Sequence, residues 1–218
     1  MIRGLLSAPV ALLLVLTGCG DDSAGAPQTT ITPTDTLAST SAPDSDEGEI
    51  TLASGVSVHY RCVGDGAPAI LLEAGTDSAG TSSFGPAFVD PLSKGSRVCT
   101  YDRLGTGMSD GAPDRKRTID DLCDVEDEVR GKLGLGGPSV LAGQSGGANL
   151  AIWCASRKPA AVASLVSIEG YHDDPANLAK EVANEGSDWR DNPEHMDWVQ
   201  SSVMLDDMSM PIGRIPVL

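Results

Sequence analysis

The chain has 218 residues, of which 40% are hydrophobic and 21% are charged, and this composition suits one α/β or α+β domain with a single core. Its formal net charge is -16, and its longest basic cluster is the short stretch DRKR at residues 114–117. Because phosphate binding needs a basic surface, the charge argues against a nucleic-acid partner.

The first nineteen residues differ from the rest of the chain. Arg3 precedes the apolar stretch LLSAPVALLLVL, and LTGC follows at residues 16–19. This pattern predicts a bacterial secretory signal, because the apolar run is too short to span a bilayer comfortably. LTGC resembles the bacterial lipobox, which implies cleavage before Cys19 and lipid attachment to its thiol. A plain export signal with an incidental cysteine and a retained transmembrane helix are the alternatives.

Residues 20–48 are rich in Ser, Thr, Pro, Asp and Gly and contain almost no large apolar side chain. Such a segment cannot bury enough surface to fold, so we expect a disordered tether with a span on the order of 30 Å. The folded domain is expected to begin near Glu49. Together with the lipobox, the tether predicts an extracytoplasmic domain anchored to the cell membrane by lipidated Cys19, or secreted if Cys19 is not modified.

Four further cysteines would lie in an oxidising compartment if the chain is exported. Cys62 and Cys99 fall in expected strands, whereas Cys123 and Cys154 fall in expected helices, so we favour pairing like with like over the other two possible pairings. Buried free thiols are the alternative. The cysteine spacing and the scattered histidines disfavour a zinc site, and we expect neither a metal nor a cofactor.

Strand and helix patterns alternate along the folded part. EITLASGVSVHYRCVG at residues 49–64 predicts a hairpin of two strands. Buried parallel strands are predicted by short apolar runs at residues 69–75, 96–102, 139–143 and 163–170. Crossover helices are predicted between them at residues 85–95, 118–134 and 147–159.

This alternation predicts a mostly parallel, doubly wound α/β sheet with helices on both faces and an antiparallel hairpin at its leading edge. Residues 171–210 lose the strand pattern and become rich in Asp, Asn and Trp, so we expect a partial cap over the carboxyl edge of the sheet. Within that cap, Trp189 and Trp198 are candidates for either core packing or substrate contact. GRIPVL at residues 213–218 predicts the start of another buried strand.

A Gly-x-Ser-x-Gly sequence, GQSGG, occupies residues 143–147 between an expected strand and an expected helix. This order of strand, sharp turn and helix is typical of a nucleophile elbow, in which the serine takes a strained conformation. Gly143 and Gly147 fit the interpretation, because side chains there would collide in so tight a turn. A glycine-rich turn without catalytic meaning is the alternative.

Three stretches together resemble the α/β-hydrolase fold superfamily, in its serine hydrolase branch, from Glu49 to the end of the chain. They are AILLEAGTDSAGTSSF, VCTYDRLGTGMSD and VLAGQSGGANLA, in the family's order and at its usual spacing. The resemblance implies Ser145 as the nucleophile, with oxyanion-hole N–H donors from Gly146 and from Thr76 or Asp77. It also implies that the middle stretch is a structural turn.

A serine nucleophile needs a base and an acid that orients the base, and the family carries them in the order Ser, acid, His. GRIPVL resembles the family's seventh strand, so the usual acid loop and the histidine loop would lie beyond Leu218. We therefore expect a truncated domain without its last strands, inactive or impaired as given. A premature stop, a fragment or a pseudoenzyme with another way to complete its sheet would each account for it.

Residues inside the chain offer weaker substitutes for the missing acid and base. Glu169, at the end of an expected strand with Asp173 close behind, is a candidate for the acid or a carboxylate that caps a turn. His172 and His195 fall in or beside the cap, and His59 falls on the hairpin, so we expect all three to be surface or packing residues.

These observations predict an exported, lipid-anchored α/β-hydrolase. It would act on a small-molecule ester or amide through an acyl-Ser145 intermediate. The alternative is a catalytically silent surface lipoprotein, either a pseudoenzyme or a binding module, that keeps the elbow as scaffold.

Overall fold

The computed structural model describes residues 45–135, 137–170, 175–185 and 188–208. They all belong to one compact unit, Ser41–Leu218. The expected signal peptide with Cys19, the tether as far as residue 44, His172, Asp173 and the strand expected at residues 213–218 lie outside the described residues. No helix among the described residues is long and apolar enough to cross a membrane.

Within the described residues, six strands form one mixed sheet in the order β1-β2-β4-β3-β5-β6. Their bounds are Ser45–Thr51 for β1, Ser57–Val63 for β2, Ile70–Glu73 for β3, Val98–Tyr101 for β4, Ser139–Gln144 for β5 and Val162–Ile168 for β6. Both β1 and β4 pair with β2 in the antiparallel sense, and β4, β3, β5 and β6 run parallel to one another. The expected parallel sheet with an antiparallel hairpin at its leading edge is confirmed.

The hairpin begins earlier than expected. Residues 45–48 were assigned to the tether, yet β1 starts at Ser45, which pairs with Val63. The reason is a polar contact that composition does not reveal: Asp46 accepts a hydrogen bond from the Tyr60 hydroxyl at 3.0 Å and forms an ion pair with Arg97 at 3.2 Å. Backbone pairing therefore extends into a segment that has little apolar surface to bury.

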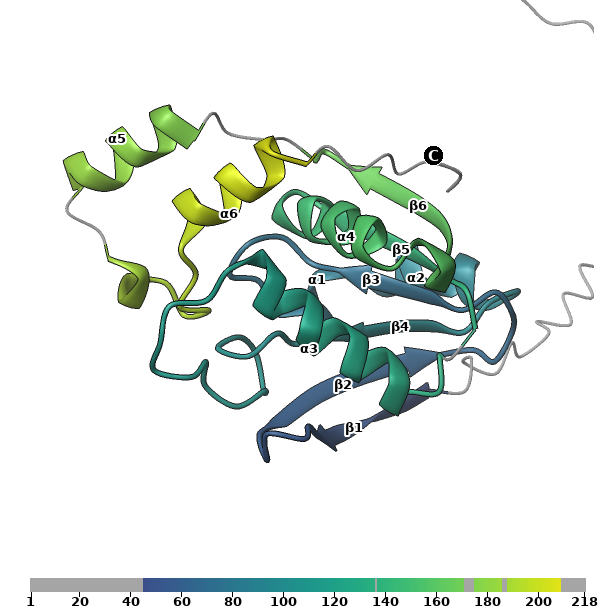
Figure 1. Ribbon diagram of the computed structural model, residues 1–218. Coiled ribbons are helices and arrows are strands. Elements are labelled where there is room, and N and C mark those ends of the chain that lie inside the picture. The colour runs from purple at the N-terminus through teal and green to yellow at the C-terminus, as the bar shows by residue number, and fades with distance from the viewer. Residues whose placement is uncertain (1–44, 136, 171–174, 186–187, 209–218) are drawn as a thin grey trace, which may run out of the picture. The chain divides into compact units, whose positions relative to one another are not determined.

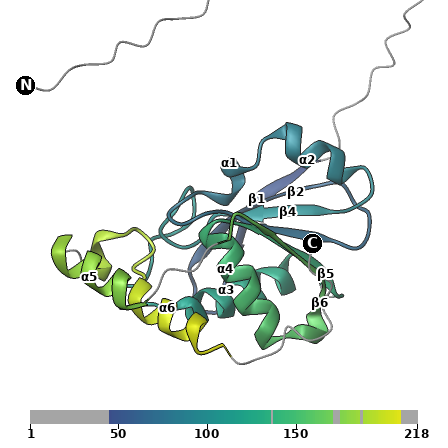
Figure 2. The same ribbon diagram turned by 90° about the horizontal axis from the view of Figure 1, so that it is seen from above.

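Helices cover both faces of the sheet (Figures 1 and 2). The short helix α1 and the helix α2 lie on one face, and α3 and α4 lie on the other. Their bounds are Gly80–Ser83 for α1, Pro86–Ser93 for α2, Ile119–Lys132 for α3 and Gly146–Arg157 for α4. A capping box between Thr118 and Asp121 starts α3, whose buried stripe includes Ile119, Leu122 and Val129.

Two disulfides among the described residues each link two elements of the same layer. Cys62 on β2 is joined to Cys99, which faces it directly on β4. Cys123 on α3 is joined to Cys154 on α4. The pairs link like element to like element, as the sequence analysis favoured, and all four cysteines belong to the main hydrophobic cluster.

After β6 the chain forms short helices, in the region where the cap was expected. These are α5 (Pro175–Glu185), the 3-10 helix η2 (Trp189–Asp191) and α6 (Trp198–Asp206). Figure 1 shows α5 and α6 at the end of the sheet toward which β6 points. The helix α6 is tied to the start of α3, because the Ile119 N–H donates to the Ser201 hydroxyl at 3.1 Å.

Candidate active site

Ser145 occupies the turn between β5 and α4, with φ 54° and ψ -125°. A positive φ is uncommon for a residue other than glycine, and such strained residues persist where surrounding contacts impose them. Here the Ser145 N–H donates to the Ile168 carbonyl at 2.9 Å, and the Ser145 carbonyl accepts from Ala148 at 2.9 Å. The turn therefore has the strand, strained serine and helix of a nucleophile elbow.

The glycines on either side of Ser145 are required by close backbone approach. A Cβ on Gly143 would collide with the Gly147 carbonyl, and one on Gly147 would collide with the carbonyls of Glu73 and Ala74. The elbow is thus packed against the end of β3 at a distance that only glycine allows.

The loop after β3 lies directly beside Ser145. A Cβ built on Gly75 would lie 3.6 Å from the Ser145 Cβ, and one built on Gly146 would lie 3.2 Å from the Thr76 nitrogen. Neither the Gly146 N–H nor the Thr76 N–H has an acceptor among the described residues. The Asp77 N–H is already engaged, because it donates to Glu194 Oε1 at 2.9 Å. Of the two expected choices for the second oxyanion donor, Thr76 is therefore the one that remains available.

Arg103 holds this loop in place through hydrogen bonds to its backbone carbonyls. Its side chain is 4% exposed and donates to the Ala74 carbonyl at 2.8 Å and the Gly75 carbonyl at 2.6 Å. It also donates to both carboxylate oxygens of the fully buried Glu194, at 2.7 and 2.8 Å. Burial alone would lower the pKa of the Arg103 guanidinium, but the hydrogen bonds and charge of Glu194 raise that pKa above its ordinary value.

Glu194 belongs to a segment that is itself held against the domain. The Arg117 guanidinium donates to the Glu194 carbonyl at 3.1 Å, and the Arg117 N–H donates to the His195 carbonyl at 2.9 Å. Glu194 thereby links the segment before α6 to the loop that carries Thr76. The sequence analysis did not single out Glu194, because its role depends on an ion pair with a residue 91 positions away.

The turn after β4 has the structural role implied by the family resemblance. Asp102 accepts hydrogen bonds from the Thr81 N–H at 2.9 Å and from the Met108 N–H at 2.9 Å, which ties the turn to α1. Gly105 and Gly107 both have positive φ. A Cβ on Gly107 would collide with the Asp102 carboxylate.

A buried acid lies immediately before the same loop. Glu73, at the end of β3, is 1% exposed, and its carboxylate is 3.6 Å from Arg103 Nη1. Burial raises the pKa of Glu73 to about 7, although the positive charge of Arg103 acts in the opposite direction.

The candidate acid Glu169 directly follows β6 and has φ 51°. It is exposed, and it follows the residue whose carbonyl accepts the Ser145 N–H, so it lies in the same region of the sheet edge. No described histidine accompanies it. His59 is buried on β2, 3.5 Å from Asp102 and 3.4 Å from Glu47. His195 contacts the Pro113 carbonyl at 2.9 Å and the edge of Trp189.

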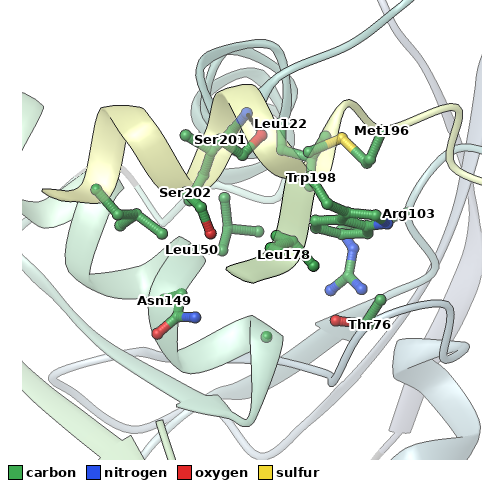
Figure 3. A pocket seen from close by; sticks show the side chains of 13 residues that line it. Thr76, Arg103, Leu122, Asn149, Leu150, Leu178, Met196, Trp198, Ser201 and Ser202 are labelled. Carbon is green, nitrogen blue, oxygen red and sulfur yellow. Dashed lines mark hydrogen bonds between the residues drawn. The ribbon is translucent and has the colours of Figure 1, made fainter. Parts of the chain in front are cut away.

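A cavity of about 180 Å³ opens beside the loop and the elbow (Figure 3). Thr76 and Gly146 lie at its border, and Asn149, one helical turn after Ser145, contributes a polar wall. Its apolar walls come from α3, α4, α5 and α6, and neither His59 nor His195 lines it. The described residues contain no cluster of His, Cys, Asp and Glu able to hold a metal ion.

A sequence model of the α/β hydrolase fold family matches residues 69–199. The chain belongs to the α/β hydrolase fold family. The matched region contains Thr76, Arg103, Ser145 and Glu169. No curated protein sequence matches the chain.

Solved structures of other α/β hydrolases resemble this one. A hydrolase from Pseudomonas aeruginosa is 22% identical with a TM-score of 0.54, and the match covers 64% of this chain and 52% of that chain. An enol-lactonase from Burkholderia xenovorans is 23% identical with a TM-score of 0.55, covering 64% of this chain and 54% of that chain.

A putative lipase from Acinetobacter baumannii is 17% identical with a TM-score of 0.55, covering 74% of this chain and 60% of that chain. At these identities the likeness shows the shared fold, and the chain spans little more than half the length of the structures it matches.

Proposed function

We propose that this protein is a serine hydrolase that cleaves an ester or amide through an acyl-Ser145 intermediate. The observation that carries the proposal is the strained Ser145, at φ 54°, at the start of α4 and beside the Thr76 loop. This strained serine lies next to the cavity, because Gly146 and Thr76 line it. A serine in an ordinary turn would have no need of this conformation.

In the proposed reaction, a base takes the proton of the Ser145 hydroxyl while Oγ attacks the substrate carbonyl carbon. The carbonyl oxygen gains negative charge and accepts hydrogen bonds from the N–H groups of Thr76 and Gly146. The positive end of the α4 dipole favours the same charge. The leaving group departs with a proton, and water then attacks the acyl-Ser145 ester to release the acid.

We assign the base to a group outside the described residues, because both described histidines are held by other contacts. Glu169 stays the candidate for the acid that orients this base, supported by its position after β6 next to the Ser145 turn. The rest of the machinery, the nucleophile and the two N–H donors, is proposed to lie within the described residues.

We further propose that the domain acts outside the cytoplasm, anchored by a lipid on Cys19 and carried by the tether that follows it. The two disulfides support an oxidising compartment, because such bonds rarely persist in a reducing one. The acidic surface and the LTGC sequence are consistent with this location.

A fluorophosphonate label tests the nucleophile, with imidazole added as an external base. If Ser145 is the nucleophile, the label should modify the full chain at this one serine, and imidazole should accelerate labelling wherever the internal base is not engaged. Ser145→Ala should abolish labelling under both conditions, whereas Ser167→Ala, a serine on β6, should label normally. Peptide mapping identifies the labelled residue.

A catalytically silent surface lipoprotein is the second candidate. The observation that favours it is that His59 and His195, the two histidines in the described part of the chain, both make contacts away from Ser145. It predicts no label on Ser145 at any imidazole concentration in a folded protein. That result would overturn the acyl-serine proposal.

A further inference from the structure

The cavity beside Ser145 begins at the two groups that would hold the reacting carbonyl. Thr76 and Gly146 border it, so a carbonyl whose oxygen accepts their N–H groups places its carbon at the cavity entrance. Figure 3 shows the side chains of Leu150 and Ser202 directed into the same space. One substituent of that carbonyl must therefore enter the cavity.

The acyl side of the substrate fits this position better than the leaving group. A second hollow of about 640 Å³ adjoins the cavity, and both are lined by Leu178, Met196 and Trp198. The leaving group has to depart before water can attack, so it belongs on the side of this larger hollow. The acyl group stays bonded to Ser145 through both steps and gains from the smaller, apolar site.

The apolar part of the cavity wall comes from four helices. Leu122 of α3, Leu150 of α4, Leu178 of α5 and Trp198 of α6 all face the cavity. Burial of one methylene group against such walls lowers the Kd by about fourfold. An aliphatic acyl chain is thus the group that these walls recognise.

Among the described residues that line it, the cavity offers no free positive charge to an acyl chain that ends in a carboxylate. Arg103 lines it, but its guanidinium is committed to Glu194 and to the carbonyls of Ala74 and Gly75. No lysine is among the lining residues. A charged chain end would lose its hydration without a partner, which excludes dicarboxylic acyl groups.

The size of the cavity limits the length of the chain. An apolar protein cavity of about 150 Å³ holds one benzene molecule, so the cavity of about 180 Å³ beside Ser145 has room for about six carbons. We propose that this cavity is the acyl site, and that the substrate is an ester or amide of an uncharged aliphatic acid of about six carbons. The assignment rests on the proposed reaction at Ser145.

Binding of neutral straight-chain amides tests the acyl site without requiring catalysis. We would titrate the full chain with butanamide, hexanamide, octanamide and decanamide and follow the fluorescence of Trp198, with Trp198→Phe to assign the signal. The Kd should fall about fourfold per methylene up to about hexanamide and then stop falling. A Kd that falls with the same slope through decanamide would overturn the proposed size.

A charged probe and filled cavities provide the controls. The six-carbon amide whose last carbon is a carboxylate should bind at least about tenfold more weakly than hexanamide itself. Ser202→Phe fills the cavity and should weaken hexanamide at least about tenfold, whereas Val203→Phe, on the exposed side of the same helix, should leave the Kd unchanged. If Ser202→Phe does not fold, Leu178→Phe fills the cavity from α5. Unchanged hexanamide binding in a folded filled variant, or equal binding of the charged probe, would overturn the proposal.

The outcome separates this proposal from the one on which it rests. Ser145→Ala should bind hexanamide like the unaltered chain, because the cavity walls do not include the Ser145 hydroxyl. Chain-length dependence without a label on Ser145 would support the aliphatic site and overturn the acyl-serine reaction. Labelling of Ser145 without chain-length dependence would support the acyl-serine reaction and overturn the aliphatic site.

Discussion

Arg103 and Glu194 form the most consequential side-chain pair in the structure, because both are buried and they hold the Thr76 loop from two sides. Arg103 binds the carbonyls of Ala74 and Gly75, and Glu194 accepts the Asp77 N–H. Thr76 lies between these attachment points. The direction of its N–H is therefore set by this buried ion pair.

We expect Glu194→Gln to destabilise the domain by about 3 kcal/mol, because the buried Arg103 would lose its closest ion pair and keep only the Glu73 carboxylate at 3.6 Å. The free energy of unfolding in urea measures the loss. The proposed labelling of Ser145 should slow at least about tenfold in the fraction that is folded, because the Thr76 N–H would no longer be fixed. Asp114→Asn, which removes an exposed pair with Arg190, is the control and should change stability by less than about 0.5 kcal/mol. Wild-type stability in Glu194→Gln would contradict this account.

Glu126 on α3 gives the stability a dependence on pH. Burial, together with the negative charge of Glu73, raises the pKa of Glu126 to about 8, against an ordinary value of 4.5. The folded state therefore keeps a proton that the unfolded state loses. Above the ordinary pKa, stability falls as the pH rises, until the pH passes about 8.

Glu126→Gln should weaken this dependence, because glutamine has no proton to lose, whereas the contribution of Glu73, whose pKa burial also raises, stays. Between pH 5 and pH 8 the unaltered chain should lose on the order of 2 kcal/mol relative to Glu126→Gln. Urea unfolding of both proteins at the two pH values measures the difference. Glu128→Gln, on an exposed part of the same helix, is the matched control and should follow the unaltered chain.

The residue scale also shows what a sequence can predict about a site. Ser145, Gly143 and Gly147 were predicted because the elbow is a local structure whose geometry depends on adjacent residues. Glu194 was not, because only the folded path of the chain brings it to Arg103. The choice of Thr76 over Asp77 depended in turn on Glu194, so it too required the structure.

At the scale of elements, the sheet and its crossover helices follow from periodicity. Short apolar runs predicted β3, β4, β5 and β6, and the apolar stripe from Ile119 predicted α3. Polar side chains decided the features that periodicity missed. Asp46 extends β1 beyond the expected boundary, and Ser201 ties α6 to α3.

The disulfide between α3 and α4 should contribute measurably to stability, because these helices cover the face of the sheet below the elbow. Cys123 and Cys154 are 31 positions apart, and removing a link over a loop of that length costs about 3 kcal/mol. The double variant Cys123→Ala, Cys154→Ala should show this loss in urea unfolding under oxidising conditions. Under reducing conditions the free energies of unfolding of the variant and the unaltered chain should differ by less than about 1 kcal/mol. An equal difference under oxidising and reducing conditions would contradict the stabilising role of the bond.

At the scale of the whole molecule, three stretches in family order were enough to predict the fold, and the family match confirms it. Whether the serine has an acid and a base could not be predicted in the same way. A nucleophile and its donors depend on two adjoining loops, whereas the acid and the base come from separate elements that only the full fold brings to the serine.

Anchoring by Cys19 is the prediction that belongs to this scale. Expressed in a bacterial host, the chain should be recovered in the membrane fraction, with an acylated N-terminal cysteine in its mass spectrum. Cys19→Ala should move the protein to the soluble extracytoplasmic fraction. Cys62→Ala, which alters a cysteine of the folded domain, should leave the anchor intact. Retention of Cys19→Ala in the membrane would instead indicate an uncleaved helix.

The most direct test of the account is the mass of the chain after incubation with p-nitrophenyl hexanoate. Because the proposed reaction passes through an acyl-serine ester, we expect a hexanoyl adduct on Ser145 when the reaction is quenched with acid during turnover. Peptide mapping should place the adduct on Ser145, and Ser145→Ala should remain unmodified. An adduct on another residue, or a folded chain that stays unmodified with imidazole present, would contradict the assignment of Ser145 as an acyl-forming nucleophile.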